Sequence, residues 1–167
     1  RPFIAEVNVV LQGAWHHFDW PGACHGYMAE LDAYACRNTA TVENAAGHSK
    51  WGRRSLRIRF ETDAGRLARI STPVLARPDV AGYGAVSTPQ LYSGMAVVLE
   101  GVTGSLNGAA SARLFIRHLT GGKWNETALL YGRPVNLAPA SPFSLTFTVP
   151  DTGGCAVLDL GVEIRSK

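Results

Sequence analysis

The sequence predicts an all-β protein, an antiparallel β-sandwich or jelly roll of about nine strands. Three observations lead to this fold class. Apolar and polar residues alternate along many short segments, turn signals rich in Gly and Pro separate those segments, and no long window has the apolar spacing of a helix except a weak case at residues 27–34. Short connections favour antiparallel neighbours, and two facing sheets bury many apolar faces economically.

The clearest strand covers residues 143–149, FSLTFTV. Phe143, Leu145, Phe147 and Val149 fall on one face, and the Ser and Thr residues between them fall on the other. This period of two is typical of a strand that buries one face only. We therefore expect Phe147 to lie in the core.

Two further segments alternate with the same period. In residues 55–60, the apolar residues Leu56, Ile58 and Phe60 oppose two arginines. In residues 156–164, one face is predicted to consist of Ala156, Leu158, Leu160, Val162 and Ile164. Less regular patterns predict six more strands, at residues 3–11, 38–43, 66–71, 95–102, 112–119 and 126–131. The longest stretch without a strand pattern is 71–89, and long excursions of this kind often serve function.

Length and charge restrict the function classes. A chain of 167 residues fits one domain over residues 1–167, and because it starts with Arg1 rather than Met we expect a fragment of a longer protein. The net charge is +3, and basic residues are scattered except for Arg53, Arg54, Arg57 and Arg59, which is too sparse for a nucleic-acid partner. No apolar run reaches the roughly 20 residues of a membrane span, so we expect no membrane partner; nothing indicates the compartment.

Three segments resemble jelly-roll carbohydrate-binding modules, the galactose-binding-like β-sandwiches. Residues 51–60, WGRRSLRIRF, resemble a strand near the start of such modules. Residues 91–102, LYSGMAVVLEGV, are similar to the strand that a glycine precedes, and residues 149–166, VPDTGGCAVLDLGVEIRS, resemble the penultimate strand with its central glycine. The usual closing strand does not follow; either residues 3–11 take its place or it is lost.

A second resemblance is carried by WHHFDWPG at 15–22, TPVLARP at 72–78 and LYSG at 91–94. Together these are similar to the C-terminal accessory β-domain of some bacterial ADP-ribosylglycohydrolase-type proteins. Both resemblances imply a non-catalytic accessory module, covalently linked to a catalytic domain of a larger hydrolase.

Residues 13–27, GAWHHFDWPGACHGY, concentrate aromatic and polar side chains in a chain that is only 9% aromatic. Sugar binding needs flat apolar faces for the ring and hydrogen-bonding groups around its rim. Trp15, Trp20 and Tyr27 are candidate faces, and His17, Asp19 and His25 are candidate rim groups; Trp124, after two glycines and a lysine, is a further candidate at a loop tip. Alternatively, Trp15 and Phe18 fill the core and only Trp20 is exposed.

Other chemistry receives little support from the sequence. Three cysteines allow one Cys24–Cys36 disulfide or three free thiols. We expect no cofactor: zinc-ligand types occur among residues 16–36 without a zinc spacing, and the resemblance allows a structural calcium ion, with Asp19, Glu30, Asp32 and Asp159 as candidate ligands. No pair of carboxylates is singled out for glycoside hydrolysis, so no catalytic residue is predicted.

The predicted function is a non-catalytic carbohydrate-binding accessory module. The alternatives are a structural or protein-interaction β-domain that packs on its own catalytic domain, and a small polysaccharide lyase or hydrolase. The lyase would use His118 with Arg113 and Arg117, but strand alternation places His118 on the opposite face from both arginines.

Overall fold

The computed structural model describes residues 28–31, 39–46, 54–61, 64–65, 67–71, 91–121 and 126–167. These residues form ten strands, and all strand pairs are antiparallel. None of the described segments is a helix with the length and apolarity that crossing a membrane requires. The predicted antiparallel all-β class is therefore confirmed.

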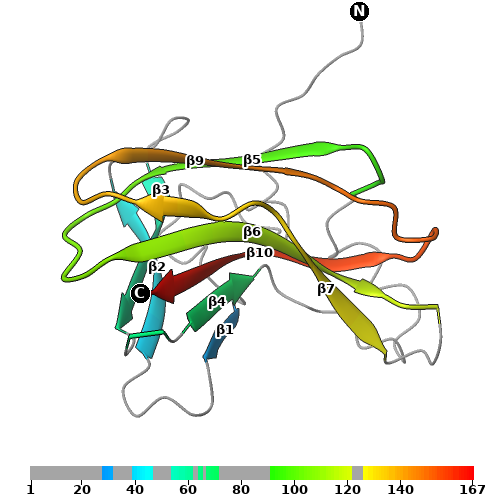
Figure 1. The fold of residues 1–167 in the computed structure, drawn as a ribbon, viewed down its shortest axis with the longest axis horizontal. Coiled ribbons are helices and arrows are strands. Elements are labelled where there is room, and N and C mark those ends of the chain that lie inside the picture. Colours follow the sequence, from blue (N-terminus) through cyan, green and yellow to red (C-terminus); the bar gives the residue numbers. More distant parts are fainter. Residues whose placement is uncertain are drawn as a thin grey trace, which may run out of the picture.

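The largest sheet has six strands. In spatial order they are β1 (Met28–Leu31), β4 (Leu67–Ser71), β10 (Val157–Ser166), β6 (Ala110–Leu119) and β7 (Thr127–Tyr131), with β8 (Val135–Leu137) also paired to β6. The two ten-residue strands, β6 and β10, lie beside each other at its centre (Figure 1). Residues far apart in the sequence therefore meet on this sheet.

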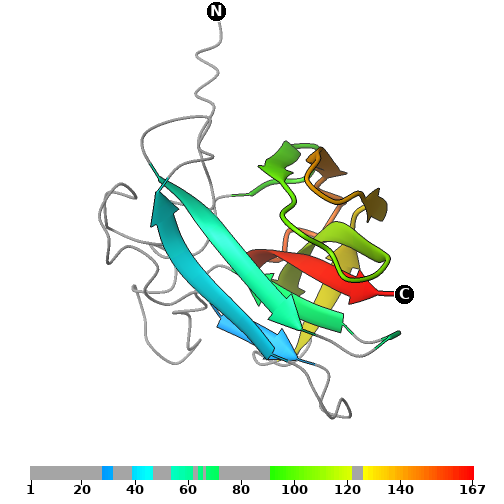
Figure 2. The same cartoon turned by 90° about the vertical axis from the view of Figure 1, so that its left-hand side faces the viewer.

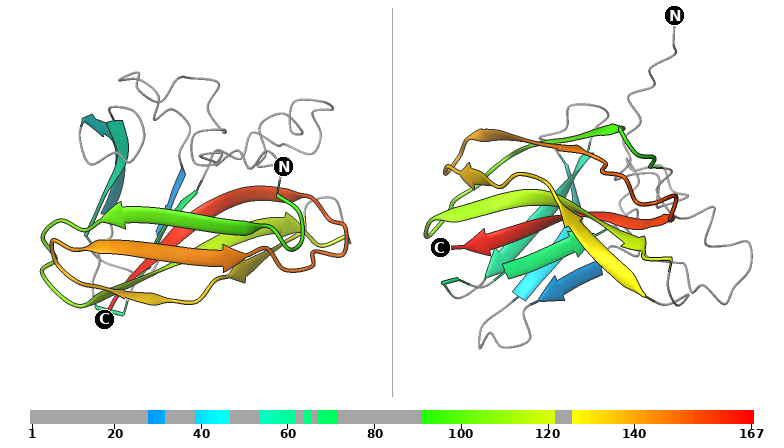
Figure 3. Two further views of the ribbon diagram at one scale, coloured as in Figure 1. Left: turned by 90° about the horizontal axis from the view of Figure 1, so that it is seen from above. Right: turned by 45° about the vertical axis from the view of Figure 1, so that its right-hand side comes forward.

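Two ribbons form the second layer. One pairs β5 (Ala96–Val102) with β9 (Pro142–Thr148), and seen from above it lies over β6 and β10 (Figure 3). The other pairs β2 (Thr39–Ala46) with β3 (Arg54–Glu61), and it is set at an angle to β10 (Figure 2). Ile58 and Phe60 of β3 pack against the same core as β5 and β9.

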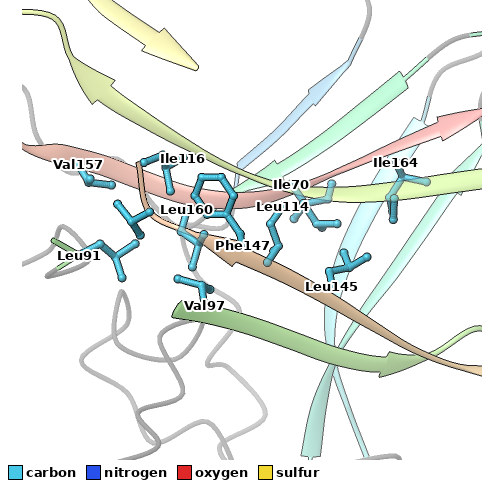
Figure 4. Packing of buried hydrophobic residues seen from close by; sticks show 13 residues of the cluster. Ile70, Leu91, Val97, Leu114, Ile116, Leu145, Phe147, Val157, Leu160 and Ile164 are labelled. Atoms are coloured by element: carbon cyan, nitrogen blue, oxygen red, sulfur yellow. The ribbon is translucent and has the colours of Figure 1, made fainter. Parts of the chain in front are cut away.

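The core lies between these layers. From the six-stranded sheet, Leu114, Ile116, Leu160 and Ile164 pack in one cluster with side chains of the β5–β9 ribbon, which include Val97, Leu145 and Phe147 (Figure 4). Val149, just after β9, is also buried, whereas Ser144, Thr146 and Thr148 are exposed. The predicted alternation of residues 143–149 is confirmed.

Eight of the nine predicted strands occur in the structure, with ends that differ by up to three residues. The ninth, residues 3–11, lies outside the described residues. Alternation in the second predicted strand is also confirmed, because Arg57 and Arg59 are exposed while Ile58 and Phe60 are partly buried. The sequence did not predict β8, a three-residue strand.

The weak helical pattern at residues 27–34 is not realised: Met28–Leu31 is strand β1. It pairs with β4 in the register Met28↔Ser71 to Leu31↔Ala68. A four-residue segment carries too little local information to select its own structure, so the edge of an existing sheet determines it.

The predicted alternation of residues 156–164 is wrong at its start. The register of β10 against β6 shifts between Val157 and Asp159, which inserts Leu158 as an extra residue. Val157 therefore joins the core, and Ala156 is exposed. A β-bulge reverses which side chains face inward, and a simple period of two cannot show it.

Candidate functional site

The six-stranded sheet has a second face, away from the core, which we call the outer face. Strand alternation places these residues on it: Arg69 of β4, Arg113, Phe115 and Arg117 of β6, Asp159, Gly161 and Glu163 of β10, and Tyr131 of β7. The register sets the charged neighbours, because Glu163 is opposite both Arg69 and Arg113, and Asp159 is opposite Arg117. Opposite charges thus lie side by side across three strands.

Glu163 is the centre of this cluster. Arg69 Nε donates a hydrogen bond to its Oε2 at 2.9 Å, and Arg113 Nε donates to its Oε1 at 2.9 Å. Arg113 Nη2 also lies 2.7 Å from Oε1. The Glu163 side chain is only 3% exposed, whereas Arg69 and Arg113 are 24% and 29% exposed. Charge-assisted contacts from two arginines satisfy the buried carboxylate, and the carboxylate in turn holds both guanidinium groups in place.

Tyr131 completes the cluster from β7. Its hydroxyl oxygen accepts a hydrogen bond from Arg69 Nη2 at 3.0 Å. The Arg113 guanidinium carbon lies 3.7 Å from the centre of the Tyr131 ring, which is cation–π geometry, and the Arg69 carbon lies at 5.9 Å. The tyrosine therefore fixes the orientation of both arginines relative to each other.

The charge of Arg69 is secure in this setting. Burial by itself lowers the pKa of its guanidinium, but the electrostatic influence of Tyr131 and the contacts with Glu163 outweigh burial and raise the pKa above its ordinary value. Arg69 is thus a permanent cation at any working pH.

Phe115 forms the floor beside the cluster. It is fully buried although it lies on the outer face, and its ring centre is 6.2 Å from that of Tyr131. The ring occupies the space that Gly161 leaves: a Cβ at position 161 would lie 2.5 Å from the Phe115 ring and would also collide with the carbonyl oxygen of Ile70. The central glycine of β10 is therefore required by close packing on this face.

A second ion pair lies further along the same strands. Arg117 Nε is 3.2 Å from Asp159 Oδ2, and Asp159 is fully buried while Arg117 is partly exposed. Asp159, a candidate calcium ligand, therefore pairs with an arginine. Among the described residues, no three His, Cys, Asp or Glu side chains gather where they could hold a metal ion.

His118 does not join this cluster. Strand alternation places it on the same side as the core-facing residues Leu114 and Ile116. It is buried, and its Nδ1 lies 2.6 Å from the carbonyl oxygen of Leu119.

The outer face thus combines fixed guanidinium donors, a phenol and aromatic rings. Such groups bind ligands rich in oxygen atoms.

The site residues predicted from the sequence, Trp15, His17, Asp19, Trp20, His25, Tyr27 and Trp124, all lie outside the described residues, as do Cys24 and Cys36. Their roles stay predictions. Cys155 is a free cysteine, which both predicted cysteine arrangements allow.

The sequence analysis did not select Arg69, Tyr131 or Glu163, and it named Arg113 only for the alternative lyase function. The sequence did contain one signal. Arginines at 113 and 117 have the same spacing as the carboxylates at 159 and 163, and both segments carry apolar residues between them. A strand face that only contacts water would not require opposite charges at matching spacing. Without the strand order, however, nothing indicated that these segments are neighbours.

No protein-family model matches this sequence, and no curated protein matches it. Solved structures with a similar fold include one of the carbohydrate-binding modules from the β-sandwich superfamily, reported for their promiscuous specificity. It is 12% identical with a TM-score of 0.59, over 86% of this chain and 51% of that chain. Another is the CBM22-1-GH10 part of an endo-1,4-β-D-xylanase 10B from Clostridium thermocellum, complexed with xylohexaose. It is 14% identical with a TM-score of 0.50, over 90% of this chain and 24% of that chain.

At these identities, the comparisons establish the fold. The predicted β-sandwich and its likeness to carbohydrate-binding modules are confirmed at that level. This chain spans about half the length of the first structure and about a quarter of the second. The likeness to accessory domains of ADP-ribosylglycohydrolase-type proteins stays a prediction.

Proposed function

We propose that this chain is a non-catalytic carbohydrate-binding module, an accessory domain of a larger hydrolase. The observation that carries the proposal is the ordered cluster of Arg69, Arg113, Tyr131 and Glu163 on a sheet face of a sandwich similar to carbohydrate-binding modules. The fold alone would not suffice, because sandwiches of this kind support many functions.

The cluster has the properties that a sugar ligand requires. Hydroxyl groups need donors and acceptors at fixed positions, and Glu163 holds the two guanidinium groups before any ligand arrives. A preorganised site loses less conformational entropy on binding than a site with free arginine side chains. Tyr131 adds an aromatic edge and a hydroxyl group at the same place.

The parent enzyme is part of the proposal. In the xylanase structure, the similar module belongs to a chain that also contains GH10, and this chain matches only 24% of it. We therefore expect a covalently linked catalytic domain, a glycosyl hydrolase or an ADP-ribosylglycohydrolase, and no catalysis by the present residues. Activity of the isolated chain on any glycan to which it binds would contradict this.

The test is a binding experiment with xylohexaose, xylan and a glycan array. Tyr131→Ala should lower affinity at least roughly tenfold, because it removes a contact of both arginines. Tyr92→Ala is the matched control, since Tyr92 is an exposed tyrosine before β5, in the other layer. A chain that binds no glycan would refute the proposed function.

A second function has one observation in its favour. Large apolar side chains are exposed along and before β5, namely Tyr92, Met95, Val98 and Val102. A domain that packs on a protein neighbour would use such a surface. For this function, Val98→Glu should weaken association with the linked catalytic domain while glycan binding is absent from the start.

A further inference from the structure

Among the outer-face side chains that the structure describes, guanidinium groups rather than carboxylates meet the solvent. Asp159 and Glu163 are both buried, whereas Arg69, Arg113 and Arg117 are each about a quarter exposed. Arg165, two positions after Glu163 on the same side of β10, is exposed. A ligand that approaches this face therefore meets positive groups first.

The charge balance of the face agrees with this. The anionic side chains that the structure describes on this face are Asp159 and Glu163. Against these two carboxylates stand five cations: Arg69, Arg113, Arg117, Arg165, and Lys167, whose Nζ contacts Asn136 of β8 at 2.7 Å. Five positive and two negative groups leave three positive charges among the described side chains of the face.

The arginines also retain donors for a ligand. A guanidinium has five N–H donors in a planar fork. Glu163 and Tyr131 engage Nε and Nη2 of Arg69, and Glu163 engages Nε and Nη2 of Arg113. In the contacts between described residues, neither Nη1 group is engaged. Guanidinium groups held at fixed positions favour anionic oxygens over neutral hydroxyl groups, because charge-assisted hydrogen bonds are about twice as strong.

We propose that the outer face binds an acidic glycan, whose anionic groups are uronic acid carboxylates or sulfate esters, in preference to a neutral one. This inference rests on the proposed function, since it names the ligand class of the same site. Arg113 and Arg69 bind the anionic group, Tyr131 orients them, and Arg165 contributes longer-range attraction.

The experiment is isothermal titration calorimetry of the whole chain at low and high salt. The probes are oligogalacturonate for the carboxylate, dextran sulfate for the sulfate ester, and xylohexaose and dextran as neutral counterparts. We expect at least one acidic probe to bind roughly tenfold more tightly than the neutral ones, with an affinity that falls as salt rises. The stronger of the two acidic probes identifies which anion the site takes.

Three variants locate the binding. Arg113→Gln should lower affinity for the acidic probe roughly tenfold, the effect expected when a charge-assisted hydrogen bond is lost. Arg165→Gln should lower this affinity severalfold. Because Arg165 is exposed, this variant should fold, so it tests the inference even if Arg113→Gln unfolds the protein. Arg59→Gln makes the same charge change at an exposed position of β3, which is not part of the outer face, and should leave affinity unchanged.

The outcomes separate the two proposals. Equal or tighter binding of xylohexaose overturns the acidic-ligand inference and leaves carbohydrate binding standing. An equal loss in Arg59→Gln and Arg165→Gln also overturns it, because the attraction would then reflect net charge alone. Failure of both acidic probes to bind overturns the acidic-ligand inference, and failure of every glycan on the array as well overturns both proposals.

Discussion

Strands β6 and β10 present two faces, one apolar and one charged, to opposite sides of the same sheet. On the inner face, Leu114, Ile116, Leu160 and Val162 pack into one apolar cluster with the β5–β9 ribbon. On the outer face, the intervening positions carry arginines and buried carboxylates. One pair of strands thus serves a core that stabilises the fold and a surface with the chemistry of a binding site.

The two faces differ in what holds them together. Apolar packing is non-directional, so substitutions on the inner face that conserve volume change stability little, whereas those that leave a cavity lower it. The outer face depends on directional contacts, because Glu163 must meet arginines that are 94 and 50 residues away in the sequence. Burying its carboxylate is favourable only while those partners remain. Mutations on the inner face therefore test apolar packing, and mutations on the outer face test charge-assisted hydrogen bonds.

The largest effect is expected on the inner face. Phe147→Ala should lower the free energy of unfolding by ~3–5 kcal/mol, because it removes a buried aromatic side chain and leaves a cavity. Chemical denaturation measures the difference. Thr146→Ala, at the exposed neighbouring position, should change it by at most about 0.5 kcal/mol. Equal effects at 146 and 147 would mean that β9 faces the other way.

The outer face should respond strongly to loss of its central carboxylate. Glu163→Gln is expected to lower the free energy of unfolding by about 2–3 kcal/mol, less than for a fully buried pair because the arginines can be rehydrated. A double-mutant cycle with Arg69→Gln measures the coupling directly. Additive effects would show that the two side chains do not interact in solution.

A methyl group at position 161 tests how closely β10 packs against the Phe115 ring and the backbone of β4. Gly161→Ala should cost about 1–3 kcal/mol, since its Cβ would collide with the Phe115 ring and with backbone of β4. Gly104→Ala provides the comparison, because nothing lies within 4 Å of a Cβ there. Thermal unfolding of the two variants should differ by several degrees. Indistinguishable curves would contradict the packing of Phe115 over Gly161.

The inner face was largely predictable from the sequence, and the outer face was not. Alternation in residues 143–149 identifies Leu145 and Phe147 as core residues, because side-chain period is a local property of a strand. Even there, the bulge at Leu158 shifted the pattern, since its cause is the register with β6. The Arg69–Glu163–Arg113 cluster depends on the order and register of β4, β10 and β6. Local sequence does not show which strands are neighbours.

The smallest effect on stability is expected from Trp20→Ala, which tests whether the aromatic segment at 13–27 and the outer face serve the same ligand. Pro21 restricts the backbone of Trp20 to extended conformations, so we predict that its ring is presented to a sugar and that Asp19 accepts hydrogen bonds from the hydroxyl groups. The melting temperature should change by only a few degrees, as for other exposed side chains.

Binding should nevertheless be lost or greatly weakened in Trp20→Ala, from a dissociation constant on the order of micromolar to millimolar. If Trp20 and Tyr131 contact one ligand, the double variant with Tyr131→Ala should lose less affinity than the sum of the single losses, because residues that share a partner are not additive. Fully additive losses would indicate two separate binding surfaces. A Trp20→Ala protein that unfolds, from a parent that binds no glycan, would instead make the segment part of the core and favour the protein-interaction function.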